Sequence, residues 1–143
     1  MITKGMFTSN TPEWATPQAF FDNLNNEFHF ELDIAASEDN HKCERYYTKD
    51  TDGLAHQDDW YGTIWCNPPY GREIGKWVEA CARYRGGQCV MLLPARTDTR
   101  WFHDYIYNDP KADIRFIKGR LHFNESKEAA PFPSMIVIFN HLS

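Results

Sequence analysis

The stretch Thr63-Ile64-Trp65-Cys66-Asn67-Pro68-Pro69-Tyr70 decides how this chain folds. Its first four residues form an apolar run, which predicts a short buried strand. Two prolines follow Asn67, and because each lacks an N–H and fixes φ, neither a strand nor a helix interior continues through them. The chain must therefore leave the sheet in a rigid turn, with the Asn67 amide and the Pro68 carbonyl at the carboxyl end of the strand. Two acceptors and the flat ring of Tyr70 suit a planar ligand that carries an amino group.

The residues before this stretch predict one helix and a first strand. Thr16 is a plausible N-cap with Pro17 at the first helical position, and apolar spacing near 3.6 residues carries the helix to about residues 25–26. Alternating apolar residues predict a strand over 28–34. The weaker expectations are a second strand over 43–47 and an irregular strand or loop over 54–60.

The residues after it predict strands that alternate with helices. Helices are expected at residues 73–84 and 100–107, and strands at 88–93, 114–117 and 135–139. The run 88–93 is continuously apolar, which is typical of a central parallel strand. A strand, a long polar loop and a last strand end the chain, so we expect an α/β sheet with a terminal hairpin.

Composition limits the class of protein. The chain has 143 residues, 42% of them hydrophobic, which favours a single folded domain over residues 1–143 with 1–11 as a loose arm. No apolar stretch approaches the roughly 20 residues of a membrane helix, and the first residues lack a signal peptide's apolar segment. We therefore expect a soluble, cytoplasmic protein without a membrane partner. The four cysteines show no CxxC spacing, so reduced, buried thiols and no metal site are expected.

Charge gives a mixed signal. The net charge of −5 is unusual for a nucleic-acid-binding protein, which commonly has a basic surface. Basic residues nevertheless gather after several predicted strands, where a site would lie. Asp33 also follows a predicted strand, just before small residues. It is either a turn or capping carboxylate or a ligand carboxylate at the carboxyl end of the sheet, and its spacing favours neither.

Several motifs in one order resemble the small phage-type DNA N6-adenine methyltransferases, the Dam-like family. They are Trp14-Ala15-Thr16-Pro17, Leu32-Asp33-Ile34-Ala35-Ala36, Asp52-Gly53-Leu54, Asn67-Pro68-Pro69-Tyr70, Leu93-Pro94-Ala95-Arg96-Thr97-Asp98-Thr99 and Gly119-Arg120-Leu121 with Phe123. The similarity spans residues 14–139. It implies a class I S-adenosylmethionine-dependent fold, which is a doubly wound, mostly parallel, Rossmann-like sheet with a reversed terminal strand.

The resemblance also implies roles for particular positions. The cofactor-binding residues would be Trp14, Thr16, Pro17, Asp33, Ala35, Asp50 and Leu54, although Asp50 and Asp52 are not separated as the ribose ligand. The catalytic residues would be Asn67, Pro68, Pro69 and Tyr70, with S-adenosylhomocysteine as product and no metal. One departure is that Asp33-Ile34-Ala35-Ala36-Ser37 replaces the glycine-rich loop of many methyltransferases, and alanine lacks the φ freedom of glycine.

The substrate implied by the resemblance is an adenine in DNA, flipped out of the duplex and stacked on Tyr70. The expected DNA-binding residues are Arg96, Thr97, Asp98, Arg100, Lys118 and Arg120. The alternatives are solvated arginines, an ion pair within the fold for Arg120, and a core position for Tyr70. The tetrapeptide also fits transfer to RNA or to a protein glutamine, or an inactive binding module. A separate target-recognition domain is not expected, and a homodimer would enlarge the basic surface, although no residue pattern demonstrates one.

Overall fold

A five-stranded mixed sheet forms the centre of the molecule. The computed structural model describes residues 14–141, so the expected arm over 1–11 lies outside the described residues. The strand order is β1-β2-β3-β5-β4. β1 (Leu32–Asp33), β2 (Ile64–Cys66) and β3 (Gln88–Pro94) pair in parallel, whereas β5 (Ser134–Asn140) runs antiparallel to both β3 and β4 (Ala112–Phe116). The predicted α/β class and terminal hairpin are confirmed, with β5 as the reversed strand.

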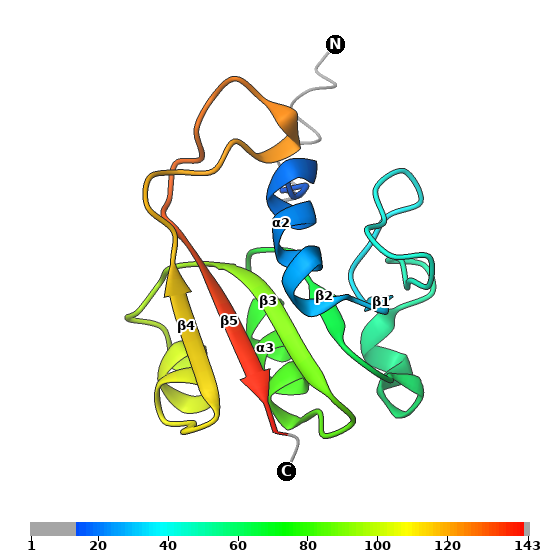
Figure 1. The fold of residues 1–143 in the computed structure, drawn as a ribbon. Coiled ribbons are helices and arrows are strands. Elements are labelled where there is room, and N and C mark those ends of the chain that lie inside the picture. Colours follow the sequence, from blue (N-terminus) through cyan, green and yellow to red (C-terminus); the bar gives the residue numbers. More distant parts are fainter. Residues whose placement is uncertain (1–13, 142–143) are drawn as a thin grey trace.

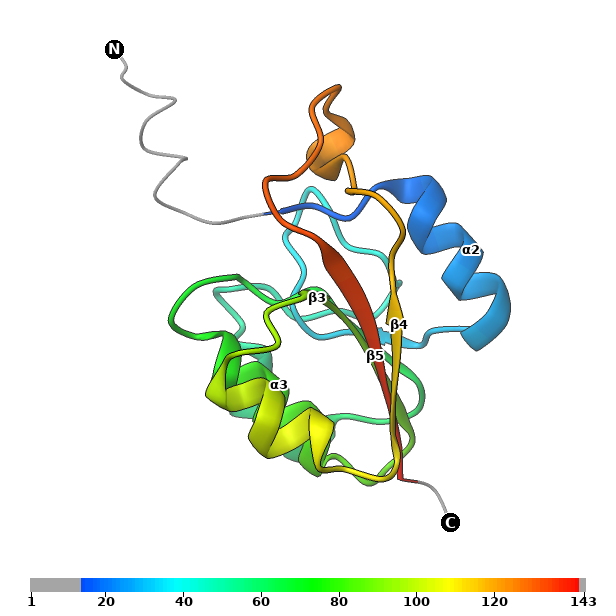
Figure 2. The same cartoon turned by 90° about the vertical axis from the view of Figure 1, so that its left-hand side faces the viewer.

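Helices lie on both sides of this sheet. α2 (Gln18–Phe28) lies on one face, and α3 (Ile74–Arg83) lies on the other together with η2 (Phe102–Tyr107), a π-helix drawn in yellow (Figures 1 and 2). Two short 3-10 helices, η1 (Gly53–Asp59) and η3 (Phe123–Glu125), lie in the connections. The sheet is mixed, and the finer doubly wound, Rossmann-like arrangement stays a prediction.

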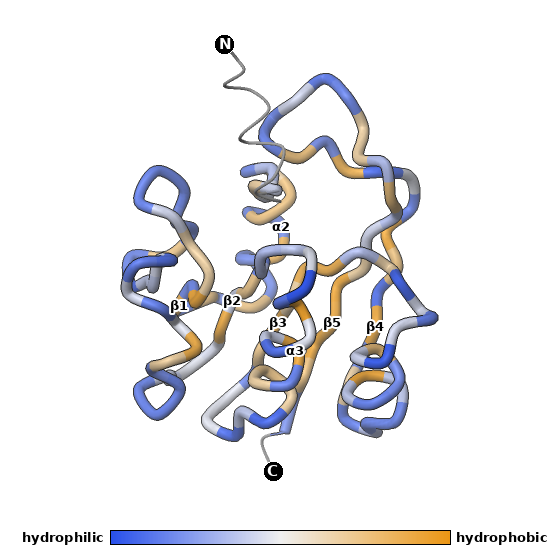
Figure 3. Tube along the Cα trace, turned by 180° about the vertical axis from the view of Figure 1, so that it is seen from behind, coloured by the Kyte–Doolittle hydropathy of each residue, from blue (hydrophilic) through white to orange (hydrophobic). Residues whose placement is uncertain are grey.

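The core is built around β3 and β5. Cys89 to Leu93 and Met135 to Val137 are almost fully buried, because the central strands are covered on both faces. Figure 3 shows the apolar trace along β3 and β5 and the hydrophilic loops around them. The continuous apolar run that predicted a central strand therefore marks the most protected part of the fold.

The predicted first strand is wrong in its bounds. Phe28 ends α2, and His29 leaves the helix with a left-handed φ of 58°, so the chain reaches the sheet only at Leu32. Phe30 packs against Phe21 and Trp65 instead of pairing in a ladder. The alternation of aromatic residues reflects this aromatic cluster rather than strand pairing. Residues 43–47 form only an isolated parallel bridge between Tyr46 and Asp33, and residues 53–59 form η1 rather than a strand.

Candidate active site

A cavity of about 830 Å³ opens where β1 and β2 end. Its walls come from four segments that follow strands or precede helices: residues 14–15, 34–40, 48–54 and 67–77, with Asn124 added from η3. The parallel pairing of Asp33 with Trp65 brings the chain after β1 beside the chain after β2. The sheet therefore places the tetrapeptide and the small-residue loop on one cavity, as expected for the carboxyl ends of parallel strands.

The side-chain amide of Asn67 is held in one orientation. Its Nδ2 donates to the Trp14 carbonyl and to Thr16 Oγ1, the latter at 3.0 Å. Its Oδ1 is buried and has no hydrogen-bond partner within residues 14–141. A buried acceptor without a partner costs about 1–3 kcal/mol. Both amide hydrogens are thus engaged by the protein, and the Oδ1 of this cavity-lining residue is left as a buried acceptor without a partner among the described residues.

The segment that holds Asn67 is itself held by η3. The Ala15 N–H donates to Asn124 Oδ1 at 2.9 Å, and the Asn124 N–H donates to the Ala15 carbonyl at 2.8 Å. The Gln18 N–H, at the start of α2, donates to Glu125 Oε2 at 2.7 Å. Glu125 therefore satisfies a free N–H of the first helical turn and lies favourably near the positive end of the helix dipole.

The prediction that Thr16 caps α2 is wrong. The residue before the helix is Pro17, no side chain at that position caps it, and the buried Thr16 hydroxyl instead accepts from Asn67. Thr16 and Pro17 do not line the cavity, whereas Trp14 does. Within this segment, Trp14 and Ala15 line the cavity, and Thr16 holds the Asn67 amide.

Tyr70 is buried, not projected from the sheet edge. Its side chain is 7% exposed, its hydroxyl donates to the Leu92 carbonyl at 3.0 Å, and its ring packs edgewise on Phe123 and Phe132. Burial raises the pKa of Tyr70 well above its ordinary value. The core position that the sequence left open is therefore the one observed, although the residue still forms part of the cavity wall.

Asp33 is buried and binds the backbone of the loop that forms part of the cavity wall. It is 2% exposed, and its two carboxylate oxygens accept the N–H groups of Ala35 and Lys42 at 3.2 and 2.9 Å. Burial raises the pKa of Asp33 to about 6, against the opposing effect of these backbone hydrogen bonds. Asp33 does not line the cavity, whereas Ala35 does. It is thus a loop-organising carboxylate that shapes the wall on which Ala35 lies.

The segment before η1 contains both candidates for the ribose ligand, Asp50 and Asp52. Asp52, Gly53 and Leu54 line the cavity, and Asp50 does not. Of the two residues that the sequence did not separate, Asp52 is therefore at the cavity and Asp50 is not. A Cβ on Gly53 would lie 2.3 Å from the Ile34 carbonyl oxygen, so only glycine allows this close approach of the two cavity walls.

The expected DNA-binding side chains lie outside the cavity. Arg96, Thr97, Asp98, Arg100, Lys118 and Arg120 are all exposed. Arg120 donates to the Ala130 carbonyl at 3.4 Å, which is a contact to the chain itself rather than an ion pair. The sequence did not single out Arg72, Glu73, Trp77, Asn40 or Asn124 as wall residues. For Arg72 and Glu73 a signal existed, because they lie two and three residues after the tetrapeptide.

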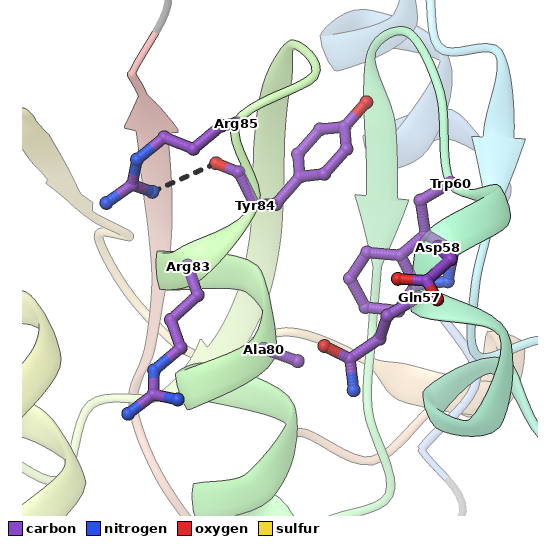
Figure 4. A pocket seen from close by; sticks show the side chains of 7 residues that line it. All are labelled: Gln57, Asp58, Trp60, Ala80, Arg83, Tyr84 and Arg85. Carbon is purple, nitrogen blue, oxygen red and sulfur yellow. Dashed lines mark hydrogen bonds between the residues drawn. The ribbon is translucent and has the colours of Figure 1, made fainter.

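A second, smaller cavity of about 220 Å³ lies between η1 and the end of α3. Figure 4 shows its lining side chains, which include Trp60 and Arg83. Arg85 turns away to donate to backbone carbonyls, and Arg83 pairs with Glu79 at 2.8 Å. None of the tetrapeptide residues reaches this cavity.

The cysteines behave as core residues. Cys43, Cys66, Cys81 and Cys89 are free and buried, as predicted. Burial raises the pKa of Cys43 to about 12 and raises that of Cys66 and Cys89 as well. Residues 14–141 contain no cluster of three or more side chains suited to a metal ion. Among the described helices, none has both the length and the apolar character to cross a membrane.

Comparison with known proteins gives concordant matches. The family model described as DNA N-6-adenine-methyltransferase (Dam) matches residues 6–143. The DNA N-6-adenine-methyltransferase of Escherichia phage T1 is 34% identical over 125 residues, which cover 79% of this chain and 50% of the phage protein. The YfdM protein of Escherichia coli (strain K12) is 39% identical over 66 residues, 41% of this chain and 70% of that protein. The chain thus spans about half the length of the phage relative.

Proposed function

Since the chain belongs to the DNA N-6-adenine-methyltransferase (Dam) family, we propose that it transfers a methyl group from S-adenosylmethionine to the N6 amino group of an adenine in DNA. The observation that carries this proposal is the buried Asn67 Oδ1, which lacks a partner within residues 14–141 and belongs to a wall residue of a cavity of about 830 Å³. An acceptor fixed in this way is prepared for a donor that the ligand brings.

The chemistry of the amino group explains why such an acceptor helps. The lone pair of adenine N6 is conjugated with the ring, which makes the nitrogen a poor nucleophile. Asn67 Oδ1 and the Pro68 carbonyl each accept one N6 hydrogen and so favour a more tetrahedral nitrogen with an available lone pair. These hydrogen bonds strengthen as positive charge develops on the nitrogen, so they stabilise the transition state more than the ground state.

The cavity fits the cofactor in size and in lining. Small-molecule sites commonly measure about 300–1,000 Å³ and combine apolar walls with a few polar groups. Here Trp14, Ala35 and Leu54 supply apolar surface, and Asp52 supplies a carboxylate suited to ribose hydroxyls. When bound, S-adenosylmethionine supplies an electrophilic methyl group on a sulfonium. The residues of this chain hold the cofactor, exclude water and orient the acceptor amine.

DNA would meet the protein through the exposed basic loops. Arg96, Arg100, Lys118 and Arg120 follow β3 and β4, and Arg72 stands at the cavity wall itself. Phosphate contacts from such residues position a duplex without reading its sequence. A base extruded into the cavity loses stacking, which costs a few kcal/mol. Contact with the edge of Tyr70 and its aromatic neighbours would offset part of that cost.

A direct transfer assay tests the proposal. Purified protein is incubated with cofactor labelled in the methyl group and with plasmid DNA, and the recovered nucleosides are separated. We expect label in N6-methyladenine. Label in RNA or in protein, with none in DNA, would identify the substrate alternatives that share the tetrapeptide. No transfer to any polymer, with cofactor binding retained, would identify an inactive binding module.

The role of Tyr70 needs its own comparison. Replacing Tyr70 by Ala should weaken capture of the base more than binding of the cofactor, when both are measured by titration. An equal loss of both would show that the residue serves only the core.

The DNA-binding role of Arg96 and Arg100 is tested by replacing both with Gln, which should weaken DNA binding and reduce its dependence on salt.

A further inference from the structure

Within residues 14–141, no strand pairs with the outer edge of β4. β4 ends the strand order, and Figures 1 and 3 show it at one side of the sheet, with no described strand beyond it. Phe116 on this strand is 63% exposed, and Tyr107 at the end of the adjoining η2 is 68% exposed. An open edge presents unpaired backbone groups to other chains, and natural proteins commonly protect it with charges.

The hydrogen-bond pattern shows which backbone groups face outward. The Asn140 N–H donates to Lys111 O and the Ile117 N–H donates to Ser134 O, so the odd-numbered residues of β4 bond to β5. Ala112, Ile114 and Phe116 therefore direct their backbone groups to the free edge. The Ala112 N–H is already used by Asp109 O. The groups that remain directed at the edge are the Ala112 carbonyl and the backbone N–H and C=O of Ile114 and Phe116.

The charges on this strand are complementary to themselves. Asp113 and Arg115 flank Ile114 and lie on the same face of the sheet, because side chains alternate along a strand. When two such strands pair antiparallel with Ile114 opposite Ile114, each Asp113 lies opposite Arg115 of the other copy. An edge strand with charges of one sign would repel the same strand of a second copy. The opposite charges of Asp113 and Arg115 instead attract the β4 of a second copy.

We propose that β4 is a homodimer surface, on which a second copy of this chain adds its own β4 antiparallel about Ile114. The two Ile114 residues exchange N–H···O bonds, and each Phe116 N–H donates to Ala112 O of the second copy. Asp113 joins Arg115, whose Nη1 and Nη2 already bind Glu27 at 2.8 and 2.6 Å and whose remaining donors are available. Phe116 gains cover from the second copy.

The symmetry of this pairing has a consequence for the cavities. β4 points in the same direction as β1, β2 and β3, because β5 is antiparallel to both β3 and β4. Antiparallel pairing of the two β4 strands makes one continuous sheet whose copies point in opposite directions. The two cavities, which lie where β1 and β2 end in each copy, then open toward opposite ends of that sheet.

Charge exchange between two variants tests this surface. Asp113→Arg and Arg115→Asp each place like charges opposite each other in a homodimer, while a mixture of the two variants restores both opposite-charge pairs. In sedimentation equilibrium, starting near the solubility limit, we expect the unmodified chain to dimerise weakly, as a small interface does. Each single variant should raise the dissociation constant by about tenfold or more, and the mixture should recover association.

The control is Glu44→Arg, an exposed carboxylate beyond β1 at the other edge of the sheet, which changes the net charge as Asp113→Arg does. It should leave association unchanged, and circular dichroism of every variant should report a native fold. A monomer at all concentrations, single variants that still dimerise, or a mixture that stays monomeric would each overturn the proposal. The measurement needs no methyl transfer, so its result is independent of the proposed function.

Discussion

Replacing Asn67 by Ala should separate activity from stability. In the proposed reaction the variant lacks the acceptor that strengthens as charge develops on the N6 nitrogen. Removal of one such preorganised group commonly lowers kcat by about 10²–10³, or about 3–4 kcal/mol. We therefore expect turnover to fall by at least that factor, while cofactor binding changes by a few fold.

The structure predicts a much smaller effect on the free energy of unfolding. The variant loses the hydrogen bonds to the Trp14 carbonyl and Thr16 Oγ1, each worth about 0.5–1.5 kcal/mol. It also removes the buried, unpartnered Oδ1, whose desolvation costs about 1–3 kcal/mol. These two effects oppose each other, so the net change should be about 1 kcal/mol in either direction.

Three measurements on the same preparation separate the effects of Asn67→Ala on rate, cofactor affinity and stability. Single-turnover methyl transfer gives the rate, cofactor titration gives the affinity, and urea denaturation gives the stability. Asn23→Ala, which truncates an exposed amide on α2, is the matched control and should leave the rate unchanged. If Asn67→Ala retained more than about a tenth of the wild-type rate, the acceptor role argued from the free Oδ1 would be wrong.

Three further substitutions probe two wall residues of the cavity and the buried Asp33. Gly53→Ala brings a Cβ within 2.3 Å of the Ile34 carbonyl oxygen, so it should cost about 1–3 kcal/mol in urea denaturation and weaken cofactor binding. Tyr70→Phe removes the hydroxyl bonded to the Leu92 carbonyl and should cost about 1 kcal/mol with little change in transfer rate. A large loss of rate there would give the hydroxyl a chemical role. Because burial raises the folded-state pKa of Asp33 from 3.8 to about 6, its contribution to stability is fully present below the lower value and is lost as pH rises through the higher one. The Asp33→Asn variant has no carboxyl group to ionise there, so it does not lose this stability. The free energies of unfolding of the wild type and the variant, measured against pH, should therefore diverge by up to about 3 kcal/mol between about pH 4 and pH 7. Parallel profiles would contradict the raised pKa of Asp33.

The sequence predicted the elements whose signals are local. β2, β3 and β5 follow from continuous apolar runs, and α3 follows from the spacing of Ile74, Trp77, Val78 and Cys81. The position of the tetrapeptide at the end of a strand follows from the apolar run over 63–66 and the two prolines that end it. These features depend on residues within one element, which a sequence pattern can register.

The errors concern residues whose partners are distant in sequence. Thr16 has the residue type and position of an N-cap, but its hydroxyl is engaged by Asn67, 51 residues later. At the start of α2, the free N–H of Gln18 is instead accepted by Glu125, 107 residues later. Asp52 and Asp50 differ by two positions, and only the fold of the loop turns one of them to the cavity. No periodicity encodes such contacts.

The hydrogen bonds of Ala15 and Gln18 to η3 bear on the order in which the molecule can be completed during synthesis. The N-terminal wall of the cavity leaves the ribosome early, but Asn124 and Glu125, which fix it, are translated more than a hundred residues later. β5, the last strand made, must then insert between β3 and β4. A nascent chain can therefore assemble β1 to β3 before η3 is available to hold the segment that binds the Asn67 amide. A chain that ends before residue 124 would lack the hydrogen bonds that Asn124 and Glu125 make to residues 15 and 18, even where the tetrapeptide itself had been translated.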